Sequence, residues 1–248
     1  MTASAVITDE ERNFKMSVFS HYNIPYYLLW EVSLLTYCMS DIHGEIDRYH
    51  TMLERIQFSE NDTLYIIGDV IDRYPGGIEI LKEVMAASNI IMLLGNHEQM
   101  CLDTLGPFNV YGSRALWQQN GGSSTYRELL YVCSVAERRK IIGFLMKLPD
   151  HLDIEVGGRK FHLVHGVPSN QPDDRIWERP AADAPPPIEG CTVIVGHTPT
   201  CYMTGNKEEI FRIWHGSGII DIDCGCGHKT EYRRLACLRL DDMREFYV

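Results

Sequence analysis

Apolar and polar residues alternate in blocks along residues 34–98, and each block has the length of a strand or a helix. Three apolar runs predict strands: LLTYCMS (34–40), TLYIIG (63–68) and IIMLLG (90–95). Between them, 45–58 places apolar side chains on one helical face, and 78–88 has the length of a second helix. This order predicts a parallel α/β sheet covered by helices, because runs that are apolar throughout are expected when both faces of a sheet are buried.

The pattern changes in the second half of the chain. Residues 99–148 are predicted to be helical, and Ser134 and Glu137 have the spacing of a capping box before a helix that ends near Pro149. A hairpin around Gly157-Gly158 and three further strands are then predicted: 152–166, 192–196, 219–223 and 234–240. The Pro- and Asp-rich segment 168–190 predicts a long surface loop, of a length that is often functional.

The first 33 residues have neither a strand nor a helix period. We therefore expect an N-terminal extension of unknown role at 1–33, followed by one domain at 34–248. The early acidic residues Asp9, Glu10 and Glu11 do not fit the basic start of a secretory signal. The apolar piece 26–39 contains Glu31 and is too short to span a bilayer, so a cytoplasmic protein is expected.

Composition narrows the class of protein further. Hydrophobic residues make up 45% and charged residues 23%, as in soluble globular proteins. The net charge of -11 argues against a broad nucleic-acid or anionic-membrane surface, since both require cationic patches. Eight cysteines are present without a C-x-x-C pair, which argues against a zinc ribbon and favours buried free thiols in a reducing compartment.

Five predicted strands end in a His, Asp or Asn. The side chains in question are Asp41 and His43, Asp69 and Asp72, Asn96 and His97, His165, and His197. Each motif alone has an ordinary structural explanation as a turn, a helix cap or a core histidine. Together they favour a site, because ligands bind at the carboxyl ends of strands and converging carboxylates and imidazoles lose hydration unless cations hold them. Asp, Asn and His suit Mn, Fe or Zn better than Ca.

The motifs, in this order, resemble those of the calcineurin-like metallophosphoesterases, in their phosphoprotein phosphatase version. They are Asp41-x-His43-Gly44, Gly68-Asp69-x-x-Asp72-Arg73, Gly95-Asn96-His97-Glu98, a strand-end His165, and Gly196-His197-Thr198-Pro199. Asn120-Gly121-Gly122 and Ile176-Trp177-Glu178-Arg179 resemble the small bacterial and phage-lambda-type serine/threonine protein phosphatases. The resemblance covers roughly residue 34 to the C-terminus and implies two mixed β-sheets packed as a sandwich and flanked by helices.

The resemblance also implies a role for each matching residue. It assigns a first metal to Asp41, His43 and Asp69, and a second metal to Asp69, Asn96, His165 and His197. Arg73 and Arg179 would grip phosphate oxygens, which their planar forks suit. His97 would be the general acid, oriented by Asp72, and not a metal ligand. Two divalent ions, with Mn preferred and Fe or Zn as alternatives, would supply a bridging hydroxide that attacks phosphorus directly.

Some residues depart from the family pattern or receive ordinary roles. Tyr74 stands where the family usually has Gly, so it could alter the pocket beside Arg73. Gly166 replaces a common Ala, which should be harmless. Glu98 is expected to brace its loop and His162 to be structural. Cys224 and Cys226 are expected to be thiols packed near the site, with Asp223 in support.

The predicted function is a metal-dependent phosphomonoesterase, most simply a serine/threonine protein phosphatase acting on a phosphorylated protein or peptide, with no nucleic-acid or membrane partner. Three alternatives stay open. Symmetrical diadenosine tetraphosphate hydrolases or broad phosphatases share these motifs, but the hydrolases usually lack an Asp at the position of Asp72. Cys133 and Arg139 match the C-x5-R spacing of cysteine-dependent tyrosine phosphatases, without its glycines. A non-catalytic binding module would typically lose ligands, and every expected position is filled here.

Overall fold

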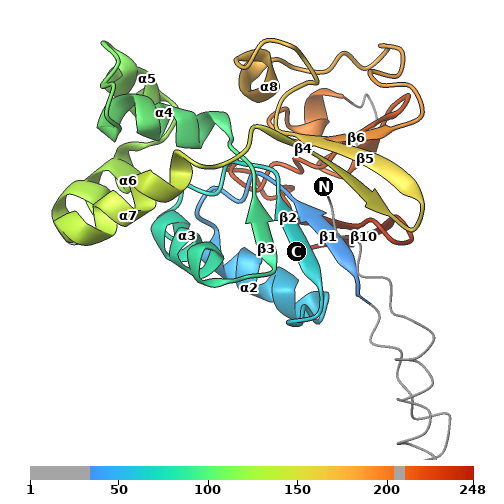
Figure 1. Ribbon diagram of the computed structural model, residues 1–248, viewed down its shortest axis with the longest axis horizontal. Coiled ribbons are helices and arrows are strands. Elements are labelled where there is room, and N and C mark those ends of the chain that lie inside the picture. Colours follow the sequence, from blue (N-terminus) through green and yellow to red (C-terminus); the bar gives the residue numbers. More distant parts are fainter. Residues whose placement is uncertain (1–33, 204–209) are drawn as a thin grey trace, which may run out of the picture. The chain divides into compact units, whose positions relative to one another are not determined.

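The computed structural model describes residues 34–203 and 210–248, and the predicted extension 1–33 lies outside them. The described residues form two five-stranded mixed sheets with helices beside them (Figure 1). This arrangement confirms the predicted α/β fold and the expected sandwich of two flanked sheets.

The first sheet contains the three strands predicted from residues 34–95. Its order is β10 (Arg244–Tyr247), β9 (Ala236–Arg239), β1 (Thr36–Met39), β2 (Thr63–Ile66) and β3 (Ile90–Met92). The strands β1, β2 and β3 are parallel, as their alternation with helices predicts, whereas β9 runs antiparallel to β1. Sequence patterning missed β10, because its half-exposed REFY segment lacks an apolar run.

The second sheet is built from the β-rich half of the chain. Its order is β4 (His151–Val156), β5 (Arg159–Val164), β6 (Thr192–Val195), β8 (Ile219–Asp221) and β7 (Trp214–His215). The predicted hairpin is β4–β5, and both turn residues, Gly157 and Gly158, have positive φ of 56° and 76°. Positive φ at both central positions suits glycine, and it matches the twist of a two-residue hairpin. The two-residue strand β7 is too short to predict from patterning.

Helices occupy the segments that the patterning predicts. They are α2 (Ile46–Arg55), α3 (Gly77–Ala86), α4 (Asn96–Leu105), α5 (Ser113–Gln119), α6 (Ser123–Arg127), a π-helical turn (Glu128–Val132) and α7 (Val135–Leu145). The capping box of α7 is confirmed, since Ser134 Oγ accepts from the Glu137 N–H at 3.2 Å and Glu137 Oε2 accepts from the Ser134 N–H at 2.9 Å. The loop predicted at 168–190 contains one short helix, α8 (Asp174–Trp177).

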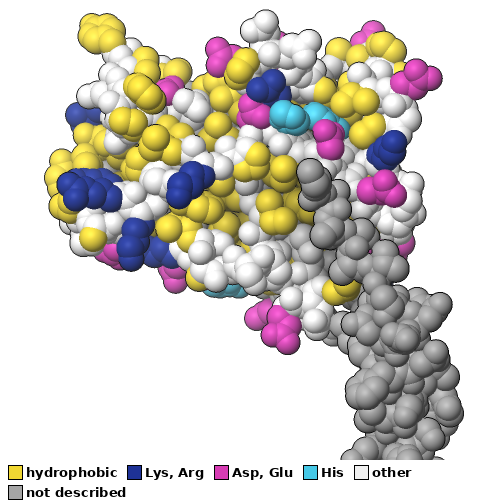
Figure 2. Space-filling view, in the orientation of Figure 1, with side chains coloured by type: hydrophobic (Ala, Val, Ile, Leu, Met, Phe, Trp, Pro, Cys, Tyr) yellow, Lys and Arg dark blue, Asp and Glu magenta, His cyan; other side chains and the backbone are white. Residues whose placement is uncertain are grey.

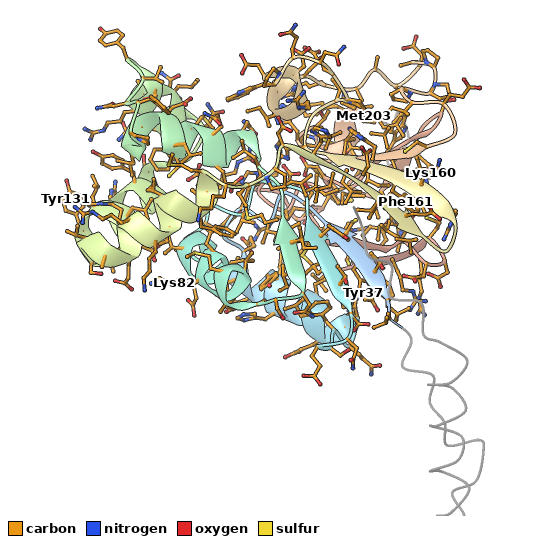
Figure 3. The ribbon with its side chains drawn as sticks, in the orientation of Figure 1. Tyr37, Lys82, Tyr131, Lys160, Phe161 and Met203 are labelled. Atoms are coloured by element: carbon orange, nitrogen blue, oxygen red, sulfur yellow. The ribbon has the colours of Figure 1, made fainter. Side chains whose placement is uncertain are left out.

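Two apolar layers fix the sheets in place. Phe161 of β5, labelled in Figure 3, belongs to an apolar cluster with Ile194 of β6 and Leu238 of β9, which joins the two sheets. Tyr37 and Met39 of β1 belong to a second layer, which joins the first sheet to the helices α2 and α3. Because side chains on both faces of β1 are buried, its position is set by packing on two sides. The carboxyl ends of β1, β2 and β3 are thereby held in fixed relation.

The segment 107–148 has many exposed apolar side chains. Most of the exposed large apolar side chains of the described residues lie there, including Phe108, Tyr111, Tyr131 and Val132. Figure 2 shows hydrophobic side chains beside Lys and Arg on this helical part of the molecule. Such a surface is typical of sites at which proteins associate.

Two further expectations concern cysteines and membranes. All eight cysteines are free, five of them buried and three half-buried, which confirms the prediction of free thiols. Within residues 34–203 and 210–248, no helix has both the length and the apolar character that a membrane span requires.

Candidate metal centre

The backbone at the ends of the strands is held in an uncommon conformation. Six predicted site residues have a positive φ, between 50° and 75°: Asp41, His43, Asp69, Asp72, Arg73 and His197. Residues other than glycine seldom adopt this region, and such positions cluster at functional sites. The backbone at Gly95 also packs closely against Asp69, which only glycine permits, because a Cβ atom at this position would lie 2.2 Å from Asp69 Oδ1.

Asp69 lies at the centre of the site, between the other predicted ligands. Its carboxylate oxygens are 3.7 Å from His43 Nε2 and 3.4 Å from His165 Nε2. Asp41 Oδ1 lies 3.7 Å from the same His43 nitrogen. Two groups of candidate ligand atoms therefore share Asp69, one with His43 and His97 and one with His165 and His197. A single carboxylate with two oxygens is suited to bridge two cations.

Three imidazoles are oriented by backbone carbonyls, so that their other nitrogen faces the site. His43 Nδ1 donates to Ile71 O at 3.1 Å, His165 Nδ1 to Ile67 O at 2.8 Å, and His197 Nε2 to Trp177 O at 2.9 Å. His43 Nε2 is buried and has no hydrogen-bond partner among the described residues. This is the arrangement of metal-binding histidines, in which the second N–H fixes the tautomer. The donor set therefore fits a metal ion.

Asn96 completes the second group of candidate ligands. Its Oδ1 lies 3.1 Å from His165 Nε2 and 3.2 Å from His197 Nδ1, so three acceptor atoms converge. Rotating the amide would point its NH2 group at the same nitrogens and at Asp69. With Oδ1 facing the two nitrogens, the amide oxygen could bind a cation held by the same histidines without adding negative charge.

The electrostatics of the cluster favour positive charge at its centre. Burial alone would lower the pKa of His165, but Asp69 and Asp41 raise it to about 10. Burial would raise the pKa of Asp69, but His165 and His97 hold it well below its usual range. Burial, followed by the charge of His165, lowers the pKa of His197 to about 3. The carboxylates that raise the pKa of His165 would equally favour a divalent cation in place of its Nε2 proton.

His97 differs from the three other imidazoles in what its second nitrogen contacts. Its Nδ1 lies 2.7 Å from Asp72 Oδ2, and its Nε2 lies 3.4 Å from the Arg73 guanidinium. Nε2 is also 3.8 Å from Asp69 Oδ2, so distance alone leaves His97 among the candidate ligands. A carboxylate at Nδ1 and an arginine at Nε2 suit acid–base chemistry at the edge of the metal site.

A pocket of about 370 Å³ opens over the metal site. Both predicted phosphate-binding residues, Arg73 and Arg179, line it together with Asp69, Asn96, His97 and His197. Sequence analysis did not single out Tyr202 or His228, which also line the pocket. Only the position of Tyr202 and His228 after the other motifs in the sequence could have indicated a role at the pocket, because no local pattern marks either residue.

Glu98 lies under the site and has the bracing position that was expected. Its carboxylate accepts the N–H groups of Asp69 at 2.8 Å, Val70 at 3.0 Å and Gly95 at 3.2 Å. Burial and the neighbouring Asp69 raise its pKa to about 7. It therefore ties the end of β2 to the start of α4.

Tyr74, His162 and the cysteines Cys224 and Cys226 do not line the pocket. The Tyr74 hydroxyl donates to His228 O at 3.3 Å, and the Arg233 guanidinium lies 4.6 Å from the Tyr74 ring centroid. His162 lies 2.7 Å from Asp153 Oδ1, on the strand next to it. Cys224 and Cys226 are buried, and burial raises the pKa of both thiols.

The C-x5-R segment does not form a phosphate-binding loop. Cys133 follows the π-helical turn, and helix α7 begins at Val135, so the five residues before Arg139 enter a helix. Burial raises the pKa of the Cys133 thiol, whereas a nucleophilic cysteine needs a lowered one. This geometry argues against the cysteine-dependent alternative.

Comparison with known proteins gives a family match over most of the chain. The family model described as calcineurin-like phosphoesterase matches residues 34–222. A solved structure titled a putative diadenosine tetraphosphatase superposes with a TM-score of 0.58 at 17% identity, covering 88% of this chain and 94% of that one. A protein serine/threonine phosphatase from Saccharomyces cerevisiae gives a TM-score of 0.58 at 11% identity, covering 88% and 80%. Both likenesses show the fold alone.

Curated relatives match a shorter segment. The symmetrical bis(5'-nucleosyl)-tetraphosphatase of Delftia acidovorans is 44% identical over 64 residues, which are 25% of this chain and 23% of that protein. The corresponding protein of Salmonella paratyphi B is 36% identical over 67 residues, covering 26% and 24%. The chain thus matches about a quarter of the length of these relatives. By the family match, which extends over most of its length, the chain belongs to the calcineurin-like phosphoesterase family.

Proposed function

We propose that the protein is a metal-dependent phosphomonoesterase that acts on phosphoserine and phosphothreonine in proteins. The observation that carries this proposal is the buried pair of His97 and Asp72 at the wall of the pocket, next to Arg73. An alkoxide from serine or threonine is a poor leaving group. Its departure is helped by a proton donor, and His97 has the position of one.

Each site residue has a role in this proposal. Asp41, His43, Asp69, Asn96, His165 and His197 would hold two divalent ions, with Mn preferred for this mixture of Asp, Asn and His donors. When bound, the ions would lower the pKa of a coordinated water and neutralise phosphate charge. Arg73 and Arg179 would bind the phosphate oxygens, and His97 would protonate the departing oxygen. The reaction needs no covalent phosphoenzyme.

Two observations support a protein substrate. Asp72, which the dinucleotide hydrolases usually lack, is fully buried and contacts His97. The exposed apolar residues of the segment 107–148 also give the molecule a surface on which a protein could dock, and Asn120 joins this segment to the pocket. The expected partner is a phosphorylated protein or peptide.

A second candidate function is symmetrical hydrolysis of diadenosine tetraphosphate. The 44% identity over 64 residues to such a hydrolase favours it, although the match covers 23% of that protein. The pocket also contains Tyr202, whose exposed ring could stack on a base.

Turnover of a substrate panel decides between the two candidates. The manganese-loaded protein is assayed with phosphoserine, phosphothreonine and phosphotyrosine peptides and with diadenosine tetraphosphate. We expect the highest kcat/KM for the phosphoserine or phosphothreonine peptides. A strong preference for the dinucleotide would replace the first proposal by the second. Preference for phosphotyrosine would retain the phosphomonoesterase and change its substrate class.

A further inference from the structure

Helix α6 and the turn that precedes it hold the backbone of Asp72 and Arg73. The Asp72 N–H donates to Thr125 Oγ1 at 3.1 Å, and the Arg73 N–H donates to Gly121 O at 3.1 Å. Both residues of this pair have positive φ, 75° and 65°, so their conformation needs support from outside. Gly121 in the turn and Thr125 in α6 supply that support from about 50 positions further along the chain.

The two glycines of Asn120-Gly121-Gly122 are required by close approach. Gly121 has a φ of +99°, and a Cβ atom there would lie 3.0 Å from Arg73 Cγ. A Cβ atom at Gly122 would lie 2.3 Å from the indole ring of Trp117. The motif therefore seats Trp117 at the end of α5 and brings the turn against Arg73.

Trp117 contacts the same carboxylate oxygen as His97. Its side chain is fully buried, and its Nε1–H donates to Asp72 Oδ2 at 2.6 Å. His97 Nδ1 lies 2.7 Å from that oxygen, whereas Asp72 Oδ1 is buried without a hydrogen-bond partner among the described residues. The indole N–H is thus the second polar group that fixes the rotation of the carboxylate, besides the imidazole itself.

We propose that Trp117 is a positioning residue that acts through Asp72 to aim His97 Nε2 into the pocket, and this inference rests on the proposed acid role of His97. The indole ring fills the core as any buried aromatic residue would. The N–H group adds the specific effect, because an aromatic ring without it would leave the Asp72 carboxylate free to turn away from His97. Asn120-Gly121-Gly122 is then part of the machinery that orients the acid.

The variant Trp117→Phe separates the N–H group from the aromatic ring. The manganese-loaded variant is assayed with phenyl phosphate, a poor leaving group, and with 2,4-dinitrophenyl phosphate, a good one. We expect kcat for phenyl phosphate to fall about 10- to 100-fold, the effect of losing a hydrogen bond to a charged group, and kcat for the dinitrophenyl ester to change less than about threefold. Equal losses on the two esters would overturn the proposal, and so would unchanged kcat on both.

Two further variants show whether the loss acts through His97. Tyr126→Phe removes a polar group from the ring that meets Trp117 edge-on at 6.0 Å, and we expect it to leave kcat unchanged on both esters. In the His97→Asn background, Trp117→Phe should cause no further loss, because the residue to be positioned is absent. A loss that multiplies with that of His97→Asn would contradict the proposed route.

The tautomer of His97 gives a readout that does not depend on the substrate. Nitrogen-15 NMR of the zinc-loaded protein should show His97 protonated at Nδ1, and Trp117→Phe should shift the ring toward a mixture of tautomers. An unchanged tautomer together with unchanged kcat would leave Trp117 as core packing alone and overturn the proposal. If the protein prefers diadenosine tetraphosphate, the proposed function fails while this spectrum still decides the role of Trp117.

Discussion

At the residue scale, the partner of the second ring nitrogen separates the histidines of the site. His43, His165 and His197 each donate to a backbone carbonyl, which leaves a lone pair directed at the cluster. His97 contacts the carboxylate of Asp72 instead. A carbonyl orients a metal ligand, and a carboxylate stabilises the cationic ring that acid–base chemistry requires. Residue type alone would not distinguish these two uses.

Replacing His97 tests this distinction. We expect His97→Asn to lower turnover of substrates with poor leaving groups by roughly 10²- to 10⁴-fold, because the proton donor is lost. Manganese binding, measured by calorimetry, should be unchanged, since the six proposed metal ligands remain. His165→Asn serves as the comparison, and there manganese binding should weaken. Wild-type turnover in His97→Asn would remove His97 from the mechanism.

At the element scale, the sheet that carries Asp41 is extended beyond β1 by a hairpin from the C-terminal end of the chain. The strand β9 pairs with β1, and β10 pairs with β9. Their turn is held by Asp242, which accepts from Arg239 Nε at 2.8 Å and from the Arg244 N–H at 3.2 Å. Met243, between Asp242 and Arg244, has a φ of 63°, so the turn benefits from these contacts. The hairpin therefore limits fraying on the side of β1 that faces away from β2.

The hairpin should contribute a pH-dependent term to the free energy of unfolding. The hydrogen bond from Arg239 lowers the pKa of Asp242 to about 2. Since the folded pKa lies below the unfolded value of about 3.9, the stabilisation is complete above pH 4 and is lost as the pH falls toward 2. Asp242→Asn should lower stability at pH 7 by less than about 1 kcal/mol, because the pair is half exposed.

Urea unfolding of the wild type and Asp242→Asn between pH 7 and pH 3 measures this difference. The gap between the two proteins should narrow as the pH falls below 4. Asp183→Asn, at an exposed loop position, provides the control and should show no gap at any pH. A gap that stays constant with pH would show that Asp242 acts through packing and not through its charge.

At the scale of the whole molecule, the site joins elements from both sheets. Asp41 and Asp69 follow strands of the first sheet, whereas His165 and His197 follow strands of the second. The apolar layer between the sheets, which includes Ile67 and Leu163, fixes these ends relative to one another. A metal that bridges the groups should therefore stabilise the packing of the sheets, since binding to the folded state alone adds stability.

Metal addition and removal test this linkage. At free Mn²⁺ one hundred times Kd, binding contributes about 2.7 kcal/mol, which should raise the thermal midpoint by about 5–10 °C for a chain of this size. A chelator should reverse the rise and abolish turnover. Asp69→Asn should lose most of the rise, because Asp69 belongs to both groups of candidate ligands. An equal rise in Asp69→Asn would place the metal elsewhere.

The sequence by itself determined the elements and the motif residues. Local periodicity indicates which faces are buried, so the strands β1, β2 and β3 and the helices between them could be predicted from one stretch of chain. The order of short polar motifs then selected a family, and with it the expected ligands. The short elements β7, β10 and α8 escaped, because they combine two to four residues with the lack of an apolar run.

Only the tertiary structure decided which side chains meet. Trp117 and Asp72 are 45 positions apart, and no local pattern predicts that the indole N–H contacts the carboxylate beside His97. Nor does a pattern indicate that Tyr74 stays outside the pocket. These contacts depend on how distant elements pack, and that packing is fixed by the apolar layers on both sides of β1.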